Sequence, residues 1–69
     1  MTFNPDTDAA GAAQLVRRLL LDLARHEEET AAREAAEVPY WLPHPSSVAG
    51  HRAAAVVLRD EADRFPHAS

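Results

Sequence analysis

The placement of proline most strongly constrains what this chain can fold into. Residues 9–37 contain no proline, and most of them are alanine, leucine, arginine or glutamate, which favour helix. Pro39, Pro43 and Pro45 then follow within seven residues, and each disfavours helical geometry at the residue before it. A long helix over residues 9–37 is therefore predicted to end in a stiff, extended connection at residues 38–46.

A second, shorter helix is predicted after the prolines, over residues 47–64. Ser46 or Ser47 can cap its first turn, and Phe65-Pro66 ends it. The expected fold is an all-α antiparallel helical hairpin. The expected organisation is a flexible cap at residues 1–7, one hairpin domain at residues 8–65 and a flexible tail at residues 66–69.

Apolar residues mark the faces on which the two helices are expected to pack. In the first half of the long helix they form one broad stripe, and further along alanines form a narrower, shifted stripe that would let another helix approach closely. The shorter helix has one stripe of its own. The broad stripe comprises Ala9, Ala12, Val16, Leu19, Leu23 and His26, widened by Leu15 and Leu20; the narrow stripe comprises Ala24, Ala31, Ala35 and Val38; the stripe of the shorter helix comprises Val48, His51, Ala55, Leu58, Ala62 and Phe65.

The unequal lengths of the two helices predict an uncovered apolar end. At about 1.5 Å per residue the long helix spans roughly 43 Å and the shorter one roughly 27 Å, which leaves about ten residues of the long helix without a neighbour. Leu15 and Val16 belong to this end. Because 69 residues without isoleucine or cysteine make a thin core, a second chain is expected to cover the face from Leu15 to Leu23. A homodimer that forms a four-helix bundle is the simplest arrangement, and a different protein partner is the alternative.

The connection carries the other candidate partner-binding residues, Tyr40, Trp41 and Leu42. Aromatic side chains on a proline-stiffened loop lose little conformational entropy on binding, so they recur as interface anchors. The competing interpretation, which the small size of the core favours, is that they fold back and plug the open end of the hairpin. Both roles could hold in a dimer.

Charge and composition exclude several classes of function. The net charge is −4, and Arg17-Arg18 is the only adjacent basic pair, so a phosphate-binding surface is not expected. The connection is too long for a helix-turn-helix DNA reader. We expect no nucleic acid and no membrane among the partners, because no apolar run approaches the length of a membrane span. The absence of cysteine fits a reducing compartment, and a cytoplasmic protein is expected.

No catalytic residue, cofactor or metal site is predicted. The stretch from His26 to Thr30 begins like the zinc-binding pattern His-Glu-x-x-His, but Thr30 replaces the second histidine, so the stretch is expected to be a solvated acidic face. Whether His26, His44 or His51 converge on a metal stays open. Ser46 and Ser47 lie near His51, yet both are expected to serve as helix caps rather than as nucleophiles.

The order of these features resembles small uncharacterised helical proteins of actinobacteria and their phages. The similarity lies in Leu15-Val16, Leu19 and Leu23, the glutamate-rich stretch, paired alanines, Trp41, His51 and the segment Val57-Leu58-Arg59-Asp60-Glu61. It covers most of the chain. It implies a helical hairpin and such a source, and it carries over no activity or functional residue.

The expected function is that of a small non-enzymatic protein-interaction module, an adaptor, regulator or inhibitor that acts through the apolar helix face and the aromatic loop. A structural subunit of a larger assembly is the alternative, since obligate interfaces resemble a core cut in half. A metal-binding protein that uses histidine and glutamate is the third possibility.

Overall fold

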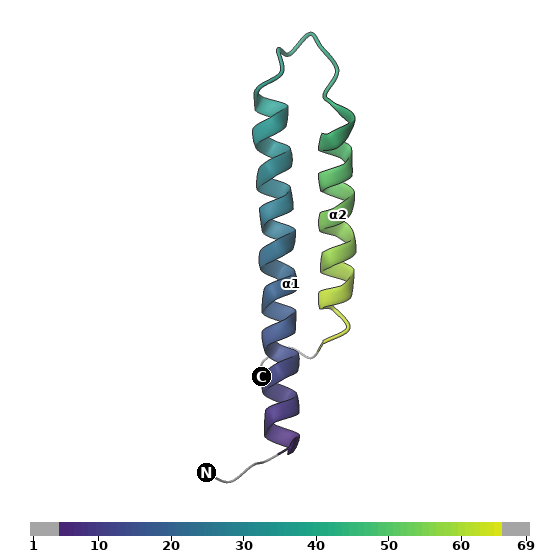
Figure 1. Cartoon of the computed structure of the whole chain (residues 1–69). Coiled ribbons are helices and arrows are strands. Elements are labelled where there is room, and N and C mark those ends of the chain that lie inside the picture. Colours follow the sequence, from purple (N-terminus) through teal and green to yellow (C-terminus); the bar gives the residue numbers. More distant parts are fainter. Residues whose placement is uncertain (1–4, 66–69) are drawn as a thin grey trace.

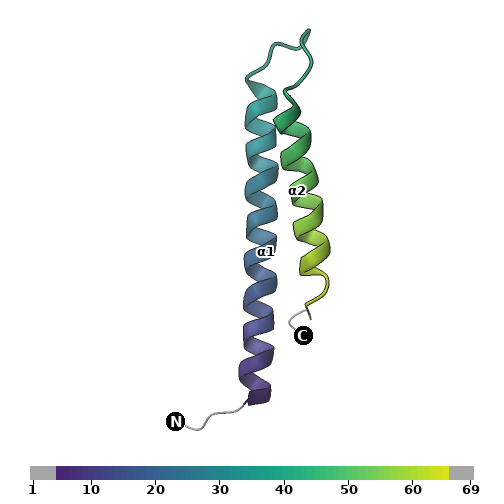
Figure 2. The ribbon, with the colours of Figure 1, turned by 45° about the vertical axis from the view of Figure 1, so that its right-hand side comes forward.

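The structure is an all-α helical hairpin, as predicted. It is a computed structural model that describes residues 5–65, and it contains α1 (Pro5–Ala36) and α2 (Ser46–Ala62). The two helices lie side by side and antiparallel, joined by one loop, and α1 continues well beyond the end of α2 (Figures 1 and 2). The predicted unpaired end of the long helix is therefore present.

The first helix begins earlier than expected. α1 starts at Pro5, so residues 5–7 belong to the helix and not to a flexible cap. Proline suits this position, because its fixed φ matches the helix and its missing N–H would have had no partner in the first turn. The predicted flexible ends at residues 1–4 and 66–69 lie outside the described residues.

The start of α2 differs from the expected serine cap. Pro45 occupies the N-cap position, no side chain caps the helix, and the Val48 N–H donates to the Pro45 carbonyl over 3.0 Å. The Ser47 hydroxyl instead donates to Oε2 of Glu34 on α1 over 2.8 Å. The prediction of a serine cap is wrong, because Ser47 finds its acceptor across the hairpin.

Small side chains form the seam between the helices. The fully buried apolar residues recur every seven positions on each helix: Ala24 and Ala31 on α1, and Val48, Ala55 and Ala62 on α2. Seven residues are close to two helical turns, so these positions share one face of each helix. The narrow alanine stripe and the stripe of the shorter helix are thus confirmed as the packing faces, and the core is thin because four of its five members are alanine.

The broad stripe of α1 faces away from this seam. Leu19 is 52% exposed and Leu23 53% exposed, although both lie alongside α2 rather than beyond its end. Leu23 precedes Ala24 by one residue and is therefore rotated by about 100° from the seam. The exposed apolar surface is larger than the predicted uncovered end, because it includes residues that flank the seam.

The connection between the helices is not extended over its whole length, because part of it folds into a turn. The Leu42 N–H donates to the Pro39 carbonyl over 3.0 Å, which closes a tight turn around Tyr40 and Trp41. The turn projects the two aromatic residues at the end of the hairpin, where Figure 1 shows the loop as the far tip of the molecule.

Candidate functional site

Two opposite sides of the hairpin can be distinguished by what borders the seam. On one side Glu28 of α1 contacts Arg59 of α2, with 2.7 Å between Oε1 and Nε. Glu28 follows the seam residue Ala24 by four residues, a rotation of about 40°, whereas Leu23 precedes Ala24 by one residue, about 100° in the other direction, so the two residues border the seam on opposite sides. We call the side of Glu28 and Arg59 the charged side, and the other the apolar side.

The apolar side consists of exposed residues of α1. Val16 and Leu19 lie seven and four residues before Leu23, hence on the same face of α1. Val57 follows the buried Ala55 by two residues, a rotation of about 200°, so it lies on the back of α2, away from α1 and from both sides of the seam. The apolar side therefore comprises Val16, Leu19 and Leu23 of α1, with Leu15 at its outer edge, and all four are exposed.

The surface area of the chain exceeds that of a compact monomer. The accessible area is 5370 Å². A compact protein of 7.5 kDa would expose about 4,200 Å² on the usual scaling of surface with mass. The excess, about 1,100 Å², reflects the elongated shape of the hairpin, whose principal extents are 61 × 20 × 18 Å.

The aromatic loop is a second exposed apolar surface. Tyr40 is 95% exposed, Trp41 69% and Leu42 50%. The expectation that these residues plug the open end of the hairpin is wrong, because they project into solvent. The rings of Tyr40 and Trp41 meet edge to face with their centroids 5.1 Å apart, a favourable aromatic geometry.

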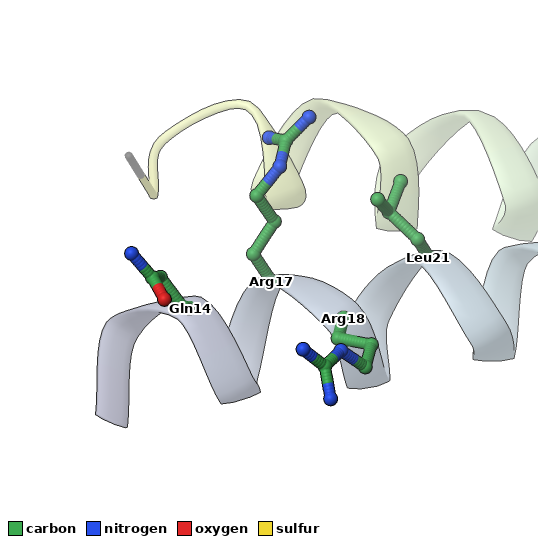
Figure 3. A pocket seen from close by; sticks show the side chains of 4 residues that line it. All are labelled: Gln14, Arg17, Arg18 and Leu21. Atoms are coloured by element: carbon green, nitrogen blue, oxygen red, sulfur yellow. The ribbon is translucent and has the colours of Figure 1, made fainter. Parts of the chain in front are cut away.

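Arg17 joins the end of α2 to the middle of α1. Its Nη1 atom donates to the Ala62 carbonyl over 2.7 Å and lies 3.6 Å from Oδ1 of Asp63. The last carbonyls of a helix carry partial negative charge and lack partners within the helix, so a guanidinium is well suited to them. Figure 3 shows Arg17 extended toward α2 while Arg18 points away from it. The two adjacent arginines therefore have different environments, and Arg17 is a structural contact.

The contrast between these arginines gives a stability prediction. Arg17→Ala should lower the free energy of unfolding by about 1.5 kcal/mol, because it removes a charged donor from a carbonyl at a helix end. Arg18→Ala, at an exposed position on the same helix, should change it by less than about 0.5 kcal/mol. Urea denaturation monitored by circular dichroism measures both. Equal effects would show that the contact between Arg17 and Ala62 contributes nothing.

A hollow of about 210 Å³ lies beside these arginines, lined by Gln14, Arg17, Arg18 and Leu21 (Figure 3). Pockets for small molecules usually enclose about 300–1,000 Å³ and bury most of their ligand. This hollow is smaller and open to solvent. It does not suit a substrate or a cofactor.

Polar residues occupy the seam near the loop. His51 of α2 lies between two carboxylates of α1: its Nδ1 atom contacts Oε2 of Glu27, and its Nε2 atom lies 3.5 Å from Oε1 of Glu34. The expectation that the stretch from His26 to Thr30 forms a solvated acidic face is wrong for Glu27, which is half-buried in this contact.

The histidines considered as metal ligands lie in different surroundings. His26 and His44 are exposed, whereas both ring nitrogens of His51 face the glutamates. No group of three or more candidate ligands converges on a point within residues 5–65. The cluster around His51 is therefore best described by hydrogen bonds and ion pairs.

Two further findings bear on what the chain is. Neither described helix is both long and apolar enough to cross a bilayer. Comparison with known protein families, curated proteins and solved structures gives no match for this chain. The surfaces described above therefore carry the functional argument.

Proposed function

We propose that this chain is a small, non-enzymatic protein-interaction module with two binding surfaces. The apolar side, made by Val16, Leu19 and Leu23, binds a second copy of the chain, and the loop with Tyr40, Trp41 and Leu42 binds another protein. The observation that carries the proposal is the exposure of both surfaces on a hairpin whose own core is almost entirely alanine. The absence of cysteine suits a cytoplasmic setting.

Self-association through the apolar side gives a four-helix bundle. A symmetric dimer places the same patch of each copy against its counterpart, so Val16, Leu19 and Leu23 of two α1 helices would meet. Leucine and valine on two packed helix pairs then supply the larger side chains that the alanine seam lacks.

The loop is suited to a different partner because it lies at the tip, far along α1 from the centre of the apolar side (Figure 2). Trp41 and Tyr40 contribute a rigid apolar contact area, and tryptophan and tyrosine dominate the binding energy of many interfaces. A regulator, adaptor or inhibitor could then dimerise through one surface and bind its target through the other. A structural subunit would bury both surfaces permanently.

Co-purification of a tagged copy with an untagged copy tests the proposal. A tagged copy should retain an untagged one, and Trp41→Ala should leave this retention unchanged while it abolishes capture of a loop-binding protein from the native host. Trp41→Phe keeps an aromatic ring and should preserve part of that capture. Failure of the tagged copy to retain the untagged one would contradict the dimer, and equal capture by Trp41→Ala would contradict the loop.

The same substitution checks the exposed position of the loop. Because Trp41 is 69% exposed, Trp41→Ala should change the free energy of unfolding by less than about 0.5 kcal/mol and leave the helical circular dichroism signal unaltered. Thermal and urea denaturation provide the measurement. A loss of about 3 kcal/mol or more, typical of a buried tryptophan, would instead indicate that Trp41 packs in the core.

A further inference from the structure

The polar contacts between the two helices differ between the loop end of the seam and its other end. Toward the end of α2 it is held by Arg17 at the Ala62 carbonyl, whereas the two helix ends below the loop are joined by Glu27, Glu34, Ser47 and His51. We call these four residues the His51 cluster. Its members are only about 30% exposed at Glu27, Glu34 and His51, so their interactions are less screened than those of surface ion pairs.

The imidazole of His51 is the link between the two carboxylates. Nδ1 contacts Glu27, and Nε2 lies 3.5 Å from Oε1 of Glu34, whose other oxygen accepts the Ser47 hydroxyl at 2.8 Å. A protonated imidazole donates from both nitrogens and satisfies both carboxylates at once. A neutral imidazole has one N–H, so one carboxylate would then face a nitrogen lone pair.

Other charged groups do not replace His51 in this role. α1 is the element packed against α2, and it presents Glu27 and Glu34 to His51. The next carboxylate, Glu28, is held by Arg59 on the charged side. Arg52 follows His51 on the exposed surface of α2. Loss of the proton from His51 would thus leave two negative charges on one face of α1 against a neutral ring.

We propose that the His51 cluster is a pH-sensitive clamp, closed when His51 is protonated, that holds together the two helix ends carrying the Tyr40–Leu42 loop. Glu34 lies two residues before the end of α1, and Ser47 is the second residue of α2. The clamp therefore fixes the spacing of the two points from which the loop departs. When it opens, the loop and the adjoining helix turns gain freedom, while Arg17 still holds the far end of α2.

The sign of the pH dependence follows from the same contacts. The hydrogen bond that His51 donates to Glu27 is the main cause that raises the pKa of His51 above its ordinary value of 6.5; desolvation opposes it, and the charges of Glu27 and Glu34 add to it. A group whose pKa is raised on folding stabilises the folded state fully below its unfolded pKa, and that stabilisation is lost as the pH rises through the folded pKa. The hairpin should therefore be held more firmly in mildly acidic solution and loosen above the pKa of His51.

Nuclear magnetic resonance of the full chain tests the clamp directly. The ring protons of His51 should titrate with a pKa above 6.5, and Glu34→Gln should lower this value while the fold is retained. Amide exchange at the loop-proximal ends of both helices should become faster, relative to the centre of α1, as the pH passes this value. Titration of His51 at or below 6.5, or uniform exchange along both helices across that pH, would overturn the proposal.

A matched pair of variants provides the second measurement. Between about pH 5.5 and about pH 8.5, where histidine is the side chain that ordinarily changes charge, the melting temperature of the wild type should fall relative to that of His51→Gln. His26→Gln alters an exposed histidine on the other helix and should follow the wild type. A parallel pH dependence in wild type and His51→Gln would rule out the clamp. This test is independent of whether the loop binds a partner.

Discussion

Ala55→Leu is expected to destabilise the hairpin by about 1–3 kcal/mol, because it forces three extra carbon atoms into the seam between α1 and α2. Ala55 is 3% exposed and lies on the face of α2 that packs against the alanines of α1. A domain of this size loses roughly 4–8 °C of melting temperature for each kcal/mol. Thermal denaturation followed by circular dichroism should show a decrease of that order.

Ala53→Leu is the control for this substitution. It makes the same chemical change two residues earlier on α2, at a position that points away from the seam and is exposed. Alanine and leucine both favour helix, so the free energy of unfolding should change by less than about 0.5 kcal/mol. If both variants behaved alike, close packing of small residues would not be what holds the two helices together.

The second large effect is expected on self-association. Leu23→Glu places a charge at the centre of the apolar side, and a symmetric dimer contains the substitution twice. If each copy costs about 2 kcal/mol, as interface anchors do, the dissociation constant of the dimer should rise more than a hundredfold. Sedimentation velocity measures the change in the dissociation constant. Circular dichroism should show that the variant keeps its helices, because Leu23 is half-exposed.

Val56→Glu separates this effect from the general cost of adding a charge. Val56 is exposed, but it lies three residues from Arg59 and therefore on the charged side of α2. Its substitution should leave the dissociation constant within a few-fold of that of the wild type. Equal weakening by Leu23→Glu and Val56→Glu would contradict an interface confined to the apolar side.

The fold could be predicted because proline and alanine act locally. Pro39, Pro43 and Pro45 interrupt helix wherever they stand, and the seven-residue spacing of Ala24 and Ala31 identifies a face that a second helix can approach. The start of α1 could not be predicted in the same way, because a proline such as Pro5 can begin a helix as readily as it can end one.

The seam near the loop could be predicted only in part. His51 falls on the apolar stripe of its helix, but the sequence alone does not say which residues face it. Glu27 and Glu34 are spaced by seven and alternate with Ala24 and Ala31, a pattern that would have placed both carboxylates in the seam. The acidic run from Glu27 to Glu29 obscured it, because such runs are usually solvated.

The exposed position of the aromatic loop could not be predicted from composition. A thin core could recruit Trp41 only if the loop reached the seam. The turn between Pro39 and Leu42 instead directs the loop outward, and Val48, at the start of α2, fills the end of the seam. The backbone turn, and not the demand for apolar core, therefore determines that Trp41 is exposed.

The most direct test of the proposed dimer is the molar mass in solution, measured by light scattering over a concentration series. The chain has a mass of 7.5 kDa, and we predict a species of about twice that mass that persists on dilution into the micromolar range. A helical, well-folded monomer at every concentration would contradict self-association through the apolar side.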